Sequence, residues 1–221
     1  MEYKKIDVET WERKSHFRWF SSFADPTAAV NVKTDVTGVL EYCRRNNVSS
    51  FAVIMYVICE CMNAEKAFRY RILGGEPVEI PYANVGYTVL VNDSYFVNCH
   101  ARTHSGFETY LSDVKGNKEK FVNNGCVQQT FNDVAVINDI YCSCVPWIAF
   151  ESVTQPIPDK DAENRAIPRA CWCKYYTENG RTFTTLNITA DHSLVDGYDI
   201  SKVFIAIQKA FDNIEDFLEA E

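Results

Sequence analysis

The sequence has little that would anchor the chain in a membrane or divide it into domains. Its longest apolar run, Phe51 to Cys59, is too short to cross a bilayer, and its first residues, MEYKKIDVETWERKSHF, lack the apolar core of a signal peptide. No Pro/Gly/Ser-rich stretch, charge run or internal repeat interrupts the 221 residues. We therefore expect a single domain over residues 1–221 and a cytoplasmic location.

Basic residues are also scarce. Lys and Arg number 22 against 30 Asp and Glu, which gives a net charge of −8, and no basic cluster is longer than Arg44-Arg45. Binding to nucleic acid or to an anionic membrane depends on clustered positive charge. We therefore expect neither nucleic acid nor membrane as a partner.

Cysteine, in contrast, is frequent. The chain has nine, six of them in the C-x-C pairs Cys59/Cys61, Cys142/Cys144 and Cys171/Cys173. An odd number cannot pair completely within one chain, and a chain without a signal peptide is expected to keep reduced thiols. Two thiols on one face of a strand would suit a soft metal, but no C-x-x-C and no His at ligand spacing accompany them. We expect small core residues and no metal, with a cysteine metal site as the weakest alternative.

Apolar residues make up 47% of the chain and aromatic residues 14%, enough for a sizeable core. Apolar spacing predicts helices at 35–46, 50–63, 105–114 with a continuation toward 121, and after Gly197. The second is apolar nearly all round, which is typical of a helix enclosed by other structure. Ser105 and Asp199 or Ser201 are expected to cap their helices.

Strand patterns occur at 68–73, 78–80, 86–92, 95–101, 139–152 and 170–190. Turn signals stand at Gly74-Gly75, Asn92-Asp93 and Glu178-Asn179-Gly180. Helices and strands are mixed without strict βαβ alternation. This predicts an α+β fold, a two-layer α/β sandwich with a mixed, largely antiparallel sheet and helices packed on it.

The sharpest chemical pattern is Asp191-His192-Ser193-Leu194-Val195-Asp196-Gly197, between the last predicted strand and the last helix. Imidazole titrates near neutral pH, so His192 could take a proton from an attacking hydroxyl or thiol. Asp196 could orient the local backbone or pair with a cation. A lone His-x-x-x-Asp is more often an ordinary loop pair, so both interpretations stay open on these residues alone.

Several ordered segments resemble the chloramphenicol acetyltransferase family. Residues 191–197 resemble its H-H-x-x-x-D-G motif, and residues 7–17 its D-x-x-x-W-x-R-x-x-H-F start. Further resemblances are Met62-Asn63-Ala64 with Phe68-Arg69, Tyr87-Thr88-Val89, residues 143–150 (S-A-x-P-W-V-x-F in the family) and Lys174-Tyr175-Tyr176. The resemblance therefore runs nearly end to end.

This resemblance implies a chloramphenicol acetyltransferase-like fold and an acetyl-CoA-dependent O-acetyltransferase that acts by direct transfer to a hydroxyl of chloramphenicol or a related small molecule. By the same match, His192 is the general base, Ser143 stabilises the oxyanion, and Asp196 forms a supporting ion pair with Arg13. The resemblance also implies a homotrimer whose active sites lie in clefts between subunits.

The match also implies ligand contacts. Phe51 and Tyr175 fall where aromatic rings pack near the pantetheine and adenine, and Lys174 could meet a phosphate. Positions that fall at the acceptor pocket are Phe20, Phe96, Val153, Arg169 and Cys171.

Several residues depart from the family pattern. Asp191 replaces the first His of the motif, and Cys171 stands where a threonine is usual. Ala28, Val153, Gln155 and Arg169 stand where the pocket is normally aromatic or aliphatic, which favours an acceptor other than chloramphenicol. Two further alternatives are a dihydrolipoamide acyltransferase, which shares H-x-x-x-D-G, and a non-catalytic relative that binds a CoA ester or a small ligand.

Overall fold

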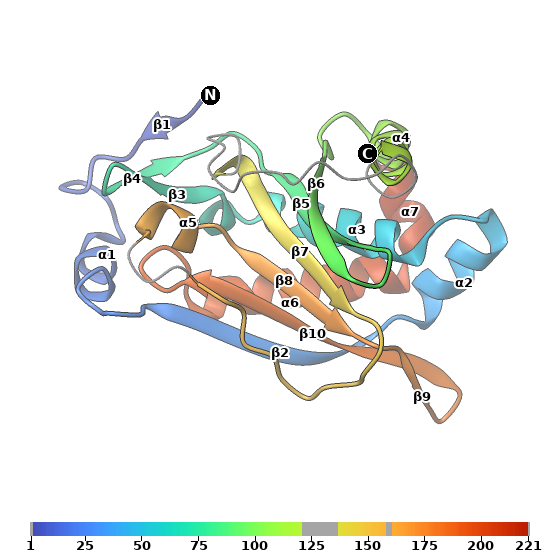
Figure 1. Ribbon diagram of the computed structural model, residues 1–221. Helices are drawn as coiled ribbons and strands as arrows, with labels where there is room; N and C mark the ends of the chain where they lie inside the picture. Colours follow the sequence, from blue (N-terminus) through green and yellow to red (C-terminus); the bar gives the residue numbers. More distant parts are fainter. Residues whose placement is uncertain (1, 121–136, 158–160, 221) are drawn as a thin grey trace.

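The computed structural model describes residues 2–120, 137–157 and 161–220, and its largest element is a seven-stranded sheet (Figure 1). The strand order is β2-β10-β8-β7-β5-β6, and β9 pairs with β10. The strands are β2 Thr27–Asp35, β5 Asn84–Val91, β6 Tyr95–Ala101, β7 Asp139–Val145, β8 Arg169–Cys173, β9 Tyr176–Glu178 and β10 Arg181–Asp191. β7 runs parallel to β5 and β8, and the other pairs among the described strands are antiparallel. The predicted mixed, largely antiparallel sheet is thus confirmed.

Helices cover one face of this sheet. The helices of the described residues are α1 Lys14–Phe20, α2 Thr37–Asn46, α3 Ser50–Ala64, α4 Phe107–Lys118, α5 Ala162–Arg165, α6 Gly197–Asp212 and α7 Ile214–Glu219, with a 3-10 turn η1 at Lys66–Arg69. Figure 1 shows α3 and α6 behind the main sheet. Residues 52–63 of α3 are buried without interruption, as its all-round apolar pattern predicts. Among the described helices, α3 and α6 thus form the layer that covers one face of the sheet.

A small second sheet lies at one end of the molecule (Figure 1). It has the order β1-β4-β3, with bounds β1 Lys4–Lys5, β4 Glu76–Glu79 and β3 Tyr70–Leu73. Its hairpin turns at Gly74 and Gly75, which have φ of 59° and 82°, in the left-handed region that glycine tolerates without strain. The predicted turn at Asn179-Gly180 has the same left-handed geometry.

Some predicted boundaries were wrong. The run 139–152 is a strand only to Val145, because Pro146 has no N–H to donate to a neighbouring strand. The helix predicted from 35 begins at Thr37, since Asp35 ends β2 and its Oδ1 accepts the Thr37 N–H at 2.9 Å. The strand predicted from 68 begins at Tyr70, after the 3-10 turn.

One capping prediction was wrong, and another was confirmed for one of its two alternatives. Gly106, not Ser105, precedes α4, and no side chain caps that helix. Asp199 takes part in capping α6 as predicted, but Ser201 instead donates to the Gly197 carbonyl. Residue 121, toward which α4 was expected to continue, lies outside the described residues.

The described cysteines are core residues. Eight of them are free thiols, and all but Cys144 are buried. Within the described ranges, no group of three or more His, Cys, Asp or Glu is placed to hold a metal ion. In the same ranges no helix is long and apolar enough to cross a membrane.

Candidate functional site

The segment after β10 forms a tight turn with His192 near its start. The Asp191 carbonyl accepts the backbone N–H groups of Leu194 and Val195, both at 3.0 Å. The His192 N–H donates to the Pro26 carbonyl at 2.7 Å, which ties the turn to the chain before β2. His192 is half-buried, with its two backbone neighbours fully buried.

The imidazole of His192 is held from two sides. Its Nδ1 lies 3.1 Å from the Val195 carbonyl oxygen, which can only accept, so Nδ1 carries the hydrogen in the neutral ring. The Phe20 ring stacks on the imidazole with 4.0 Å between ring centroids and 13° between planes. The second nitrogen, Nε2, therefore keeps its lone pair, which is the requirement for a general base.

Arg13 and Asp196 form the predicted ion pair. The Arg13 Nη1 donates to Asp196 Oδ2 at 3.0 Å and lies 3.4 Å from Asp199 Oδ2. Asp196 also caps α6 by accepting the N–H groups of Tyr198 and Asp199. Burial acts to raise the pKa of Asp196, but the hydrogen bonds from Arg13 and the helix N–H groups outweigh it and hold the pKa below its usual value. The pair thus fixes the turn relative to α6.

Asp191, a departure from the family motif, lies in a second ion pair. Its side chain is fully buried, and its Oδ2 accepts the Arg165 Nε at 2.8 Å. Its Oδ1 accepts the backbone N–H and the hydroxyl of Ser193, at 2.9 and 2.6 Å. The carboxylate of the residue before His192 therefore binds both the residue after His192 and Arg165 of α5.

Ser143 lies on the sheet face opposite to α3 and α6. It is half-buried on β7, opposite Cys171 of β8 in the strand register, and its Oγ lies 3.5 Å from the Thr88 Oγ1. Burial raises the pKa of Cys171 to about 11, so its side chain is a neutral thiol at physiological pH. A serine hydroxyl between these side chains is available to donate to an oxyanion.

A polar network covers the next part of the same face. Asn187 of β10 donates to the Asn31 side chain at 3.1 Å and to the Val153 carbonyl at 3.3 Å. Gln155 donates to the Asn187 Oδ1 at 3.1 Å. The loop after β7, which crosses in front of the sheet in Figure 1, is thereby fastened to β10 and β2.

His192 and Ser143 are far apart within one chain. Ser143 pairs with Cys171, which pairs with Asn187 of β10, and His192 follows Asn187 by five residues. With a rise of about 3.3 Å per residue and about 4.8 Å between strands, their Cα atoms lie roughly 19 Å apart. Neither side chain is long enough to span that separation, so one chain does not bring the two predicted catalytic groups together.

The predicted coenzyme residues cluster where α3 begins. The Tyr175 hydroxyl donates to the Ser50 Oγ at 3.3 Å, and the Phe51 ring lies 5.4 Å from the Trp172 ring. Burial raises the pKa of Tyr175. Lys174 is exposed beside them. Because Trp172 lies opposite Cys144 in the register, this cluster adjoins the Ser143 end of β7.

The remaining acceptor candidates are dispersed. Phe96 is 58% exposed on β6, on the same sheet face as Ser143. Arg169 is buried, and its guanidinium donates to the carbonyls of Ile167 and Asn164. Its polar end is thus occupied within its own chain.

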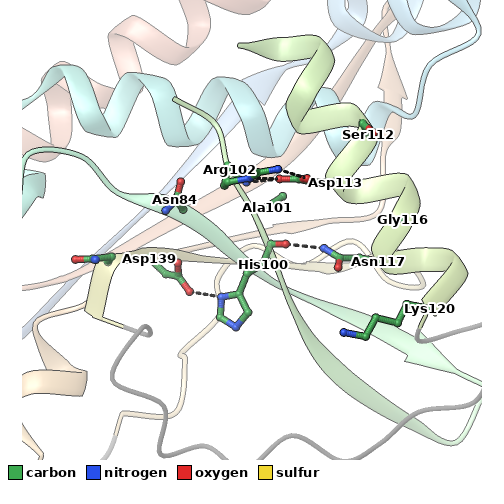
Figure 2. A pocket seen from close by; sticks show the side chains of 11 residues that line it. Asn84, His100, Ala101, Arg102, Ser112, Asp113, Gly116, Asn117, Lys120 and Asp139 are labelled. Carbon is green, nitrogen blue, oxygen red and sulfur yellow. Dashed lines mark hydrogen bonds and ion pairs between the residues drawn. The ribbon is translucent and has the colours of Figure 1, made fainter. Parts of the chain in front are cut away.

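A separate polar pocket lies between β6, α4 and the start of β7 (Figure 2). Its volume is about 470 Å³. It is lined by Asn84, His100, Ala101, Arg102, Ser112, Asp113, Gly116, Asn117, Lys120, Asn138 and Asp139. Figure 2 shows the His100 ring directed at Asp139, and their Nδ1 and Oδ2 lie 2.5 Å apart. None of the predicted site residues lines this pocket.

Sequence reasoning did not find Arg165 or the contacts of Asp191. Arg165 belongs to a four-residue helix that no periodicity indicated, and its partner is 26 residues away. No local signal in the sequence could have joined them.

Comparison with known proteins identifies similar sequences over nearly the whole chain. The family model described as chloramphenicol acetyltransferase matches residues 1–208. The chain is 26% identical to a chloramphenicol acetyltransferase of Proteus mirabilis, with 94% of each chain covered. It is 25% identical to one of Escherichia coli, with 95% of this chain and 94% of that one covered.

Solved structures share the fold. A chloramphenicol acetyltransferase superposes with a TM-score of 0.86 at 21% identity, over 94% of this chain and 99% of that one. A dihydrolipoamide acetyltransferase of Azotobacter vinelandii superposes with a TM-score of 0.66 at 11% identity, over 92% and 88% of the two chains. At these identities the structures establish the fold alone.

Proposed function

Because the chain belongs to the chloramphenicol acetyltransferase family, whose members are acyltransferases, we propose that it transfers an acetyl group from acetyl-CoA to a hydroxyl of chloramphenicol or a related small molecule. The observation that carries the proposal is the orientation of His192. Its Nδ1 is bound to the Val195 carbonyl, and the stacked Phe20 ring holds the plane of the imidazole. An imidazole held in this way presents Nε2 as a base.

The proposed reaction has one chemical intermediate. Nε2 of His192 takes the proton of the acceptor hydroxyl as its oxygen attacks the thioester carbonyl. The Ser143 hydroxyl donates to the oxyanion that forms, a contribution of about 3 kcal/mol in related chemistry. The intermediate then expels the CoA thiolate, which takes the proton from His192. No acyl-enzyme forms.

We further propose that each site is shared between two subunits of a homotrimer. The roughly 19 Å between His192 and Ser143 in one chain supports this arrangement, because both groups must reach the same carbonyl. His192 of one subunit would face Ser143 of its neighbour. The free, mostly buried thiols favour a reducing compartment, so we place the enzyme in the cytoplasm.

The acceptor is a neutral small molecule in this proposal. In the sequence, Gln155 and Arg169 favoured an acceptor other than chloramphenicol, but their polar ends bind Asn187 and the carbonyls of Ile167 and Asn164. A group already engaged in this way has less capacity to bind a ligand. Chloramphenicol therefore stays in the acceptor panel, beside other alcohols.

The first test is loss of the thioester absorbance of acetyl-CoA with chloramphenicol and a panel of alcohols and amines. A direct absorbance assay is preferable because a thiol reagent that detects CoA also reacts with accessible cysteines of the protein, which has nine. We expect turnover by wild type and none by His192→Ala. Binding of acetyl-CoA without turnover for any acceptor would instead support a non-catalytic role.

Mixed oligomers test the shared site. We would combine His192→Ala subunits with Ser143→Ala subunits and compare the mixture with each variant alone. If His192 and Ser143 act across an interface, random mixing restores about one quarter of the sites. If both groups act within one chain, mixing restores nothing.

A further inference from the structure

Around His192 the structure has a second ion pair, besides Arg13 and Asp196, and this second pair is buried. It joins Asp191, the last residue of β10, to Arg165, the last residue of α5. The Asp191 side chain has no solvent exposure and that of Arg165 has 11%. A buried carboxylate and a buried guanidinium stabilise each other, and either one alone would be an uncompensated charge.

We infer that Arg165 and Asp191 are positioning residues for His192, acting as a pair that sets the geometry and the charge of its turn. One oxygen of the Asp191 carboxylate accepts a hydrogen bond from Arg165. The other accepts hydrogen bonds from the N–H and the hydroxyl of Ser193. The backbone carbonyl of Asp191 holds Leu194 and Val195. His192 is therefore enclosed in a turn that one residue organises.

The Val195 carbonyl connects this turn to the chemistry. The Val195 carbonyl oxygen accepts a hydrogen bond from Nδ1 of His192. The position of Val195 therefore sets the direction in which Nε2 points. A displacement of about 1 Å in a reacting group can reduce the rate by about 100-fold. The pair thus acts on the base through the backbone, without touching substrate.

Arg165 contacts the His192 turn from a segment that further hydrogen bonds hold in place. Asp161 caps α5 through the Asn164 N–H, and Arg169 closes the turn from α5 into β8 by binding the carbonyls of Asn164 and Ile167. The Arg165 end of the pair is therefore held against β8 while Asp191 ends β10. The start of β8, the strand of Cys171, is thereby joined to the end of β10, the strand that precedes His192.

The charge of the pair gives a prediction that a purely structural role would not. Without Arg165, a buried negative charge adjoins His192 and favours the imidazolium; without the Asp191 charge, a buried positive charge disfavours it. Arg13, Asp196 and Asp199, which form the other ion pairs of this turn, and Asp25, next to Pro26, are unchanged in both cases. The two single variants should therefore move the titration of His192 in opposite directions.

The inference deepens the proposed function and depends on it only for its kinetic readout. We would measure the pH dependence of kcat/KM for Arg165→Met, Asp191→Asn and the double variant. We expect kcat to fall roughly 10- to 100-fold in each single variant, with KM for acetyl-CoA unchanged. The acidic limb of the profile should move to higher pH in Arg165→Met and to lower pH in Asp191→Asn, and the double variant should lie near wild type.

A readout without turnover separates this inference from the function. The chain has four histidines, so the ring signals of His192 can be assigned by comparison with His192→Gln and titrated by NMR without ligand. Opposite shifts of the His192 midpoint support the pair even if no acceptor is found. Equal shifts, or no shift with kcat within twofold of wild type, would overturn it.

Controls address folding and chemistry. Arg165→Lys keeps the charge and should retain the NMR midpoint of wild type while recovering only part of kcat. Arg45→Met removes an arginine from an exposed pair with Glu215 and should change neither readout. If Arg165→Met does not fold, Asp191→Asn and the double variant still decide the sign of the shift.

Discussion

Arg13 and Asp196 are 183 residues apart in the chain, yet Arg13 Nη1 lies 3.0 Å from Asp196 Oδ2. This contact joins the segment before α1 to the start of α6. Phe20 at the end of α1 stacks on His192, which lies shortly before α6. The ion pair therefore joins the two segments whose rings stack on each other.

Replacing Asp196 by Asn should destabilise the fold by about 1–2 kcal/mol near pH 7. The amide keeps the helix cap but loses the charge opposite Arg13, and Asp196 is too exposed for the full cost of a buried pair. Because the folded-state pKa of Asp196 is lowered, its stabilisation is complete above the unfolded value of about 4 and is lost as the pH falls through the folded value. Urea unfolding of wild type and Asp196→Asn across pH 2–7 measures the difference in stability. A difference that persisted at the lowest pH would contradict this cause.

Replacing Gly86 by Ala should destabilise the protein by about 1–3 kcal/mol. A Cβ at this position would lie 2.8 Å from Asp139 Oδ2 and 3.0 Å from the Tyr141 ring. Asp139 is buried and bound to His100, so its carboxylate cannot move without breaking that contact. The matched control is Gly116→Ala in α4, where nothing lies within 4 Å and Ala should stabilise the helix by up to ~1 kcal/mol. Equal urea midpoints for the two variants would refute the steric argument.

Cys171 should behave as a neutral neighbour of Ser143 and not as a nucleophile. With its pKa raised to about 11 by burial, its alkylation by iodoacetamide should be slow at pH 8 and accelerate as the pH rises. Cys171→Ser should keep kcat within about fivefold of wild type, whereas Ser143→Ala should lower it about 100-fold. Steady-state kinetics of both variants test this, and a loss in Cys171→Ser as large as that in Ser143→Ala would show that the thiol itself is required.

Phe20→Ala should lower kcat/KM for the acceptor about tenfold by removing the ring stacked on His192. KM for acetyl-CoA should stay unchanged, because the rings that Phe20 contacts, those of Trp19, Phe23 and His192, are not among the predicted coenzyme residues. Phe23→Ala is the control, since Phe23 contacts Phe20 and Trp19 in the same aromatic cluster. A rise in KM for acetyl-CoA in Phe20→Ala would place Phe20 in a different role.

Local patterns predicted much of the fold. The all-round apolar run at 50–63 became the buried helix α3, and the turn signals at Gly74-Gly75 and Asn179-Gly180 became hairpins with left-handed backbone. These features depend on residues that are neighbours in the chain. Predictions failed where a partner outside the segment decided the boundary, as at Asp35, which the sheet holds in β2 and not in a helix.

The sequence by itself determined the family, the position of His192 in the D-H-S-L-V-D-G motif, and the pairing of Asp196 with Arg13, because motifs are read in chain order. Only the tertiary structure decided which nitrogen of His192 is free, that Arg165 neutralises Asp191, and that Ser143 is out of reach of His192 within one chain. These three properties come from contacts between distant segments, whose distances follow from strand register and packing and are not encoded in any local spacing.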